Sequence, residues 1–287
     1  MAKKKERSLS QHMAAKKTVR YIVLILLTII CLFSFYILII NSTRAHADIT
    51  KGFSALPGTW FLDNMRNLLK NGNLPVLRGM INSLIISAGT CILSTYFSAL
   101  TAYAIHAYDF KGKKVIFTFI LAIMTIPTQV TALGFVKFMN QLGLINNFIP
   151  LIVPSIAAPT VFFFMKQYME SSLPLEIVEA ARIDGAAEFR TFNSIIIPIM
   201  KPAIAVQAIF TFVTAWNNYF TPNLLLSKTQ MKTLPILIAQ LRSADYLKFD
   251  YGQVYMMIFL SIIPVVIVYI LLSKNIIQGV AVGAVKG

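Results

Sequence analysis

Six apolar runs constrain this chain more than any other feature of its sequence. A helix needs about 20 consecutive apolar residues to cross a lipid bilayer, and no Asp, Glu, Lys or Arg interrupts any of the runs. The runs are continuous rather than alternating, which favours helices over the strands of a membrane barrel. The sequence therefore predicts an all-α polytopic membrane protein with six transmembrane helices. The runs cover residues 21–40, 81–105, 115–136, 145–165, 203–226 and 253–273.

The distribution of basic residues predicts the orientation of these helices. Cytoplasmic loops carry an excess of Lys and Arg, and the segment before the first run is strongly basic. We therefore expect both termini, and the loop between the fourth and fifth helices, to be cytoplasmic. The predicted segments are a basic N-terminus (1–20), a first helix (21–40), an external loop (41–80), a core with the other five helices and the loop 166–202 (81–273), and a cytoplasmic tail (274–287).

The N-terminal region has a second interpretation as a signal peptide, because Ala45-His46-Ala47 resembles a cleavage site. The apolar part of a signal peptide has only about 7–15 residues, so we expect an uncleaved first helix. In the external loop, apolar residues with helical spacing at 60–69 predict a short amphipathic helix with Thr59 as its N-cap. This helix is either a lid on the helix bundle or a docking surface.

Two of the runs carry signals for helix packing. In the second run, small residues such as Ser94, Ser98 and Ala102 recur every four residues, which allows helix backbones to approach closely. The fourth run contains three prolines, so we expect it to be kinked. These prolines are Pro150, Pro154 and Pro159.

The composition excludes several classes of protein. Only 13% of the residues are charged, whereas a soluble domain has about 25%. The net charge of +15 comes from basic residues spread over many loops without a basic aromatic motif, so we expect no nucleic acid partner. Two cysteines in separate runs and three scattered histidines predict neither a disulfide framework nor a metal site.

The chain lacks the groups that would let it drive transport or catalyse a reaction by itself. No Asp, Glu, His or Lys lies inside a run to couple transport to ions. Gly112-Lys113 has no glycine at the upstream position that a phosphate-binding loop requires. Nucleophile-elbow and zinc-protease motifs are also absent from the sequence. We expect a non-catalytic chain without a cofactor, whose energy comes from a partner.

The stretch 174–202 is polar, lies between two apolar runs and has the composition of a helical hairpin. We expect Ser172 to cap its first helix, with Pro174 in the first turn. Glu176 is placed to interact favourably with the N-terminal end of the helix dipole.

The second half of this hairpin is predicted to begin at a glycine turn. Glu179 and Arg182 have the spacing of an ion pair on the first helix. Asp184 and Gly185 predict a turn, with Gly185 in a left-handed conformation, and a second short helix follows at 186–193. A short exposed hairpin of this kind can seat in a groove of a partner protein.

This loop resembles the EAA loop of permease subunits from bacterial ATP-binding-cassette importers. The pattern is Glu179-Ala180-Ala181, then Gly185, then Ile195-x-Ile197-Pro198, although the family usually has Leu where Ile197 stands. The resemblance covers nearly the whole chain and is closest to the second permease of maltose-type carbohydrate importers. Other similar motifs are Asn82-Ser83-Leu84, Ala102-Tyr103-Ala104, Leu142-Gly143-Leu144, Trp216-Asn217, Thr233-Leu234-Pro235 and Gly283-Ala284-Val285-Lys286-Gly287.

The resemblance implies a multi-pass protein of the bacterial cell membrane that is a subunit of an ATP-driven importer of a sugar or oligosaccharide. Its implied partners are a second permease that shares the translocation path, two ATP-binding subunits, an extracellular solute-binding protein and membrane lipid. The implied ATPase-coupling residues are Glu179, Ala180, Ala181, Arg182, Asp184, Gly185 and Pro198. The implied contacts of the C-terminal tail with the ATPase are Gln278, Gly279 and Lys286.

The fifth run ends in polar and aromatic residues that suit a sugar, although an interfacial aromatic belt explains the same pattern. We predict that the translocation path includes this end and the residues around a kink at Pro127. These residues are Trp216, Asn217, Asn218, Tyr219, Thr125 and Gln129. Two alternatives stay open: an importer of a non-sugar solute such as a peptide or amino acid, and a membrane scaffold protein that transports nothing.

Overall fold

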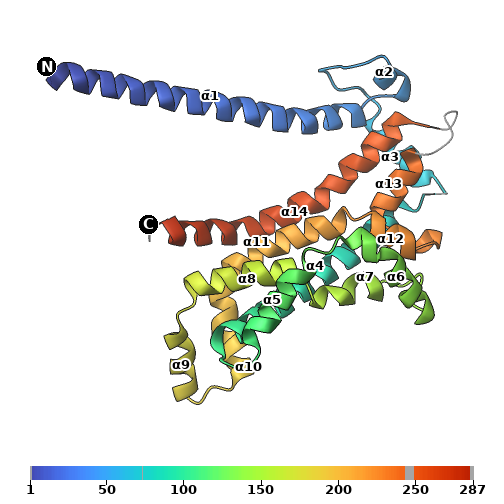
Figure 1. The fold of residues 1–287 in the computed structure, drawn as a ribbon. Coiled ribbons are helices and arrows are strands. Elements are labelled where there is room, and N and C mark those ends of the chain that lie inside the picture. Colours follow the sequence, from blue (N-terminus) through green and yellow to red (C-terminus); the bar gives the residue numbers. More distant parts are fainter. Residues whose placement is uncertain (1, 73, 243–248, 285–287) are drawn as a thin grey trace. The chain divides into compact units, whose positions relative to one another are not determined.

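The computed structural model describes residues 2–72, 74–242 and 249–284, and the side chains of residues 16–72, 74–242 and 249–274. Every regular element in these residues is a helix, which confirms the predicted all-α class. The described residues fall into two compact units. Figure 1 shows the helices of both units with their labels.

The first unit contains three N-terminal helices and the start of the last helix of the chain. α3 confirms the short helix expected in the segment 41–80, but it begins at Phe61, so Thr59 is not its N-cap. The side chains of the first apolar run are exposed from residue 21 to residue 36. The elements are α1 (Ala2–Ser42), α2 (His46–Thr50), α3 (Phe61–Lys70) and the first residues of α14 (Tyr251–Ala284).

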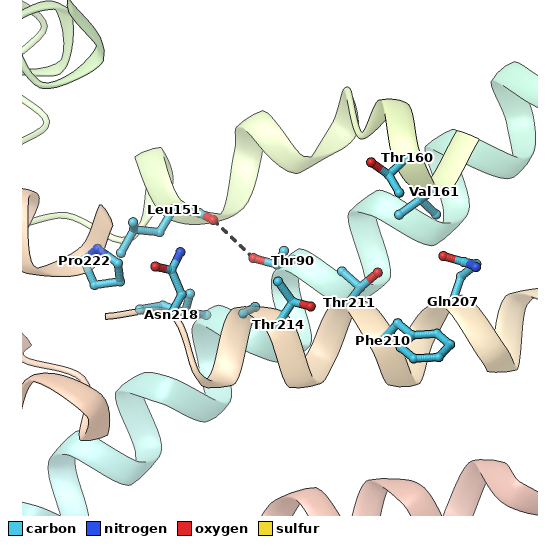
Figure 2. Close-up of a pocket in the computed structure, with 12 residues that line it drawn as sticks. Thr90, Leu151, Thr160, Val161, Gln207, Phe210, Thr211, Thr214, Asn218 and Pro222 are labelled. Atoms are coloured by element: carbon cyan, nitrogen blue, oxygen red, sulfur yellow. Dashed lines mark hydrogen bonds between the residues drawn. The ribbon is translucent and has the colours of Figure 1, made fainter. Parts of the chain in front are cut away.

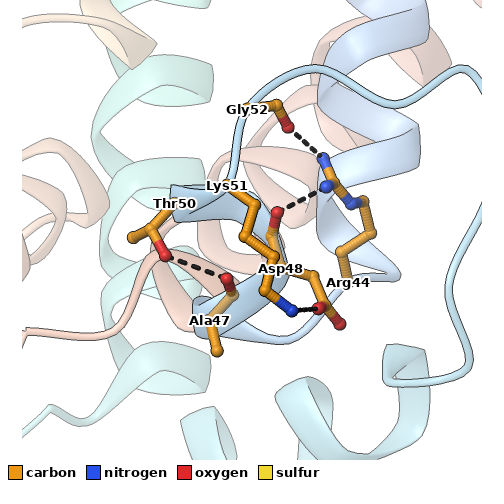
Figure 3. A network of polar contacts seen from close by, with 6 residues as sticks. All are labelled: Arg44, Ala47, Asp48, Thr50, Lys51 and Gly52. Carbon is orange, nitrogen blue, oxygen red and sulfur yellow. Dashed lines mark hydrogen bonds and ion pairs between the residues drawn. The ribbon is translucent and has the colours of Figure 1, made fainter.

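A buried arginine organises the chain between α1 and α3 (Figure 3). Arg44 donates hydrogen bonds to Oδ1 of Asn41 and to the carbonyl oxygen of Gly52, both at 3.0 Å, and to the carbonyl oxygen of Asp48. Lys51 forms an exposed ion pair with Asp48 at 2.9 Å, and its hydrogen bond lowers the pKa of that carboxyl group. Arg44 thereby closes the turn around α2 by satisfying carbonyl groups that the short helix leaves free.

Two further contacts hold the other elements of the first unit to this turn. Asn64 of α3 donates through Nδ2 to the carbonyl oxygens of Ser42, at 2.9 Å, and Arg44, at 3.0 Å. The backbone N–H of Tyr251 donates to Nδ1 of His46 at 3.0 Å, and the two rings stack with their centres 5.4 Å apart. The segment 41–70 is therefore a folded part of the protein and not an extended connection.

The second unit contains the remaining helices, and α4 contacts several of them, α8 and α11 most extensively. Its first elements are α4 (Val76–Ala107), α5 (Lys113–Ile123), α6 (Thr128–Gln141), α7 (Ile149–Ile152), η1 (Val153–Ile156), α8 (Pro159–Ser172) and α9 (Leu175–Ile183). They are followed by α10 (Glu188–Thr191), η2 (Phe192–Ile196), α11 (Ile197–Trp216), α12 (Phe220–Leu225), η3 (Thr229–Met231), α13 (Leu234–Arg242) and the rest of α14.

Small side chains let α4 approach α8 and α11 closely, as the spacing in the second run predicts. Ser94, Ser98 and Ala102 are all buried. Two polar groups of α4 are satisfied across the interfaces: Sγ of Cys91 donates to the carbonyl oxygen of Ala208 at 3.3 Å, and Oγ of Ser98 to that of Ala158 at 3.4 Å. Close backbone approach and interhelical hydrogen bonds are the forces that associate helices in lipid.

Five helical segments of the described residues are long and apolar enough to cross a membrane. They are Lys16–Ser42, Val76–Ala107, Ile149–Ser172, Glu188–Trp216 and Tyr251–Lys274. The fourth apolar run is broken at its prolines into α7, η1 and α8, which confirms the expected kink. Together with one bent pair of helices, the segments give five to six candidate spans.

The third apolar run is not a single straight helix. It divides into α5 and α6, whose axes differ by 96°. Pro127 is the N-cap of α6, with φ −63° and ψ 129°, and it has no N–H to continue the hydrogen bonds of α5. Because proline also disfavours a helical conformation at the residue before it, the chain turns between Met124 and Thr128.

We expect Arg44→Ala to loosen the segment 41–70, because the change leaves buried carbonyl groups without a donor. An unsatisfied buried polar group costs about 1–3 kcal/mol, so protease cleavage within this segment should become at least about fivefold faster. The matched control is Lys51→Ala, which removes only an exposed ion pair. Equal cleavage rates in the two variants would contradict the assigned role of Arg44.

Candidate functional site

The α9–α10 hairpin, residues 173–192, follows directly on α8 in the second unit (Figure 1). α9 begins after Pro174, which occupies the N-cap position with an extended backbone, and has Glu176 in its first turn and Arg182 in its last. Acidic residues at the start of a helix and basic residues at its end both interact favourably with the helix dipole. Val178 and Ala181 are buried and seat α9 against the rest of the unit.

A glycine in the left-handed conformation ends α9, as predicted. Gly185 has φ +74°, and its N–H donates to the carbonyl oxygen of Arg182 at 3.0 Å. The N–H of Ala186 donates to the carbonyl oxygen of Ala181 at 3.0 Å. These two bonds form a Schellman motif, which reverses the chain within a few residues.

Two details of the predicted hairpin are wrong, and the bounds of its second helix differ. Ser172 is the last residue of α8 and does not cap α9. Glu179 forms no ion pair with Arg182, because Nε of Arg182 is bonded to Oε1 of Glu188 at 2.7 Å. The short helix expected at 186–193 is present as α10, but it begins at Glu188 and continues through the π-turn η2 into α11.

The carboxylate of Glu188 connects the hairpin to the end of α4. One oxygen accepts from Arg182, and the other accepts the hydroxyl of Tyr103 at 3.0 Å. The guanidinium carbon of Arg182 lies 4.9 Å from the ring centre of Tyr108, within the range of a cation–π contact. The hydrogen bond to Glu188, and then that with Tyr108, raises the pKa of Arg182.

The outward face of the hairpin combines acidic and large apolar side chains. Glu176 and Glu179 are exposed, and Ile183 and Phe189 are 86% and 69% exposed. Of the predicted coupling residues, Ala180, Arg182, Asp184, Gly185 and Pro198 are also exposed, whereas Ala181 is buried. Ala181 therefore packs α9 within the chain and is not available to a partner in this structure.

A cavity of about 350 Å³ lies between α4, α7, α8, α11 and α12 (Figure 2). Its polar side chains carry hydroxyl or amide groups, and none of its lining residues is charged. The polar residues are Thr90, Thr160, Gln207, Thr211, Thr214 and Asn218, and the apolar walls include Ile86, Leu151, Val161, Phe210 and Pro222. Such a lining offers neutral donors and acceptors in a mostly apolar enclosure.

Gln207 is the most deeply placed amide of this cavity. Its side chain is 8% exposed, and it makes no side-chain hydrogen bond with any other described residue. The next polar residues of α11 along the cavity are Thr211, Thr214 and Asn218, which are spaced as one face of a helix. Because these side chains border the cavity, this face can exchange hydrogen bonds with a polar molecule that enters it.

The six predicted path residues do not lie together. Asn218 lines the cavity of Figure 2, whereas Trp216, Asn217 and Tyr219 together line a second cavity of about 320 Å³ with Arg242. The ring of Trp216 is buried, stacks on Phe212 and donates to the carbonyl oxygen of Ser261 at 3.1 Å. Thr125 and Gln129 are exposed at the bend between α5 and α6 and line neither cavity.

The sequence interpretation missed Thr90, Thr160 and Gln207 as cavity residues. Polar residues at the spacing of 207, 211, 214 and 218 within an uncharged run are the signal that could have found the α11 face. No sequence signal joins that face to Thr90 and Thr160, which come from other helices. Of the predicted tail contacts, Lys286 lies outside the described residues, and for Gln278 and Gly279 the structure describes the helical backbone alone.

Two of the short sequence motifs meet at the first turns of α4. Nδ2 of Asn82 donates to the carbonyl oxygens of Gln230 and Lys232, both at 2.9 Å. Oγ of Ser83 accepts the N–H of Leu234 at 2.8 Å. The motifs at 82–84 and 233–235 are thus hydrogen-bonded to each other.

Among the described side chains, no group of three or more His, Cys, Asp or Glu residues could hold a metal ion.

The sequence matches a family model described as "binding-protein-dependent transport system inner membrane component" over residues 94–281. The arabinooligosaccharides transport system permease protein AraQ of Bacillus subtilis (strain 168) is 32% identical, over 91% of this chain and 93% of that protein. The trehalose/maltose transport system permease protein MalG of Thermococcus litoralis is also 32% identical, over 92% and 94%.

The fold is also found in a solved structure. A chain of a bacterial ABC transporter involved in the import of the acidic polysaccharide alginate superposes with a TM-score of 0.75. The match covers 89% of this chain and 94% of that chain, at 23% sequence identity. This likeness shows that the two chains share a fold.

The conformation of Gly185 predicts a graded series of variants. A Cβ atom at this position meets nothing within 4 Å, so the cost of a side chain comes from the left-handed backbone, about 1–2 kcal/mol for most residues and less for Asn. Protease cleavage of the hairpin should accelerate in the order Asn, Ala, Val at position 185. Equal rates for Gly185→Asn and Gly185→Val would show that the turn does not depend on this conformation.

Proposed function

Because the chain belongs to the family of binding-protein-dependent transport system inner membrane components, we propose that it is a permease subunit of an ATP-driven importer of a sugar or oligosaccharide. As a member of this family with five to six candidate spans, it is a multi-pass protein of the bacterial plasma membrane. The sugar class follows from the relatives whose printed names refer to arabinooligosaccharides and to trehalose and maltose.

The observation that carries this proposal is the exposed α9–α10 hairpin. Its Schellman turn holds Gly185 and presents Glu179 and Ile183 on the outward face. An acidic group next to a large exposed apolar side chain suits a groove with a basic rim, which is helix-in-groove recognition. We assign this groove to an ATP-binding subunit, since the chain has no phosphate-binding loop of its own.

The other partners and the orientation follow from the same assignment. In the proposed importer, this chain and a second permease form the path, two ATP-binding subunits bind the cytoplasmic side, and an extracellular solute-binding protein delivers the sugar. Both termini and the hairpin are then cytoplasmic. Glu179, Ala180, Arg182, Asp184, Gly185 and Pro198 form the coupling surface, and Gln278, Gly279 and Lys286 belong to a tail that reaches the ATP-binding subunits.

We propose that the cavity between α4, α8 and α11 is this subunit's part of the path. Hydroxyl and amide side chains can exchange hydrogen bonds with sugar hydroxyl groups, and the absence of charge from the lining suits a neutral saccharide. Gln207 supports this assignment most strongly, because it lines the cavity and its amide makes no hydrogen bond with another described side chain, so it can bond a sugar hydroxyl group.

A changed charge on the hairpin should uncouple the importer. In the assembled complex, Glu179→Lys and Gly185→Asp are expected to abolish most sugar uptake while the chain remains in the membrane, since both changes alter the surface presented to the ATP-binding subunit. Uptake and the co-purification of the ATP-binding subunit are the measurements. Asp63→Lys, an exposed charge reversal on α3, is the control. Normal uptake by the hairpin variants, with the ATP-binding subunit still bound, would sink the proposal.

Loss of the polar face of the cavity should slow transport of neutral sugars. Each neutral hydrogen bond contributes about 0.5–1.5 kcal/mol, so Gln207→Leu with Thr211→Val should reduce uptake about tenfold. The assay uses labelled arabino-oligosaccharides, maltose and lactose. Gln167→Leu, an exposed position of α8 outside the cavity, is the matched control. If the double variant imports all three at the wild-type rate, this cavity is not part of the path.

A further inference from the structure

The last turns of α4 hold the α9–α10 hairpin at both of its ends. Before α9, Nε2 of His106 lies 3.0 Å from the carbonyl oxygen of Leu173. After α9, the hydroxyl of Tyr103 donates to Oε2 of Glu188 at 3.0 Å. Both side chains come from one helical turn of α4. The hairpin therefore has two attachment points on the same part of one helix.

A residue of the hairpin, Arg182, also takes part in the second attachment point. Arg182, at the end of α9, donates to the other oxygen of Glu188 at 2.7 Å and lies over the ring of Tyr108, which is the C-cap of α4. Glu188 thus joins α9, α10 and α4 through a single carboxylate. We call Tyr103, His106, Tyr108, Arg182 and Glu188 the α4 clamp.

Aromatic packing extends this attachment into the buried core. The ring centre of Tyr103 lies 5.7 Å from that of Phe192, which is 1% exposed and follows α10 directly. The ring of Tyr96 lies 5.6 Å from the same phenyl group, and its hydroxyl donates to Oδ1 of Asn193 at 3.2 Å. α4 is therefore in contact with the hairpin and with the segment that continues into α11.

The other half of α4 forms a wall of the cavity, through Ile86 and Thr90. No proline interrupts α4 between Thr90 and Tyr103, so the two ends are connected by about 20 Å of continuous helix at 1.5 Å per residue. Hydrogen bonds across the cavity join this half to α7: Oγ1 of Thr90 donates to the carbonyl oxygen of Leu151 at 3.2 Å. One helix thus carries both the clamp and part of the cavity wall.

We propose that the α4 clamp makes the hairpin and α4 move as one body, so that a displacement of α9 by a partner reaches the cavity through α4. Tyr103, His106, Arg182 and Glu188 are then positioning residues for coupling, which act without touching the transported molecule. This inference rests on the proposed function, because it takes the partner on the hairpin to be an ATP-binding subunit.

Because the ion pair of the α4 clamp is exposed, we infer that the clamp fixes the orientation of α9 on α4 more than it adds to the free energy of folding. The side chains of Arg182 and Glu188 are 37% and 44% exposed, and exposed ion pairs add little to folding free energy. The burial of Val178, Ala181 and Phe192 already holds the hairpin to the unit. The clamp adds directional bonds that resist sliding of α9 relative to α4, which apolar contacts alone permit.

The test measures the distance between the hairpin and the cavity end of α4 in the assembled importer. Spin labels are placed at Ile183→Cys on α9 and Ile92→Cys on α4, both exposed, in a chain with Cys31→Ala and Cys91→Ala. Distances are compared without nucleotide and with ATP and vanadate. The clamp variant carries Tyr103→Phe and Glu188→Gln, which keep the size of both side chains. Thr101→Val, which removes an exposed hydroxyl from the same helix, is the matched control.

We expect the label distance to be the same in both states for the parent and for Thr101→Val. In the clamp variant the distance should shift between states by more than about 2 Å, the size of a helix displacement, and sugar uptake per ATP hydrolysed should fall at least fivefold. With the ATP-binding subunit bound, either of two results would overturn the inference. One is a label distance that stays the same between states in the clamp variant, and the other is a label distance that changes between states in the parent. Failure of that subunit to bind the parent complex would instead overturn the proposed function.

Discussion

The packing of α4 against α8 and α11 is the contact on which the second unit depends. Lipid is as apolar as the side chains that face it, so helices associate through close approach and interhelical hydrogen bonds. α4 provides both, with buried Ser94, Ser98 and Ala102 in the interface and Cys91 bonded across it. Its first turns also bond the segment 230–234, its middle lines the cavity, and its last turns hold the α9–α10 hairpin.

Uncharged polar groups have two different roles in this arrangement. Most of them, such as Asn82 and Trp216, are satisfied by backbone carbonyl groups and so join helices. On the cavity face of α11, Gln207, Thr211 and Thr214 make no such bond with another described residue and border the cavity instead. Polar side chains that face a cavity, and not another helix, distinguish a region suited to a polar ligand from one that only packs.

The structure confirms several expectations that depend only on short stretches of sequence. The left-handed Gly185, the breaks at the prolines of the fourth run and the short helix α3 all follow from the conformational limits of single residues and from apolar spacing. The expected pairing of Glu179 with Arg182 is wrong because Glu188, brought back by the turn, offers Arg182 a closer partner together with Tyr103 and Tyr108. The second short helix is present as α10, and helical hydrogen bonding continues from it through η2 into α11.

The sequence by itself determined that this chain is an all-helical membrane protein, where its apolar runs lie and where its polar hairpin turns. It could do so because the bilayer sets the length of a span and because glycine and proline act on their own neighbours. Only the tertiary structure decided which residues share the cavity and which hold the hairpin. Thr90, Thr160 and Gln207 come from three helices, and Tyr103 meets Glu188 from far along the chain. Contacts between residues so far apart in the sequence depend on how the helices cross and rotate against each other, which no local pattern specifies.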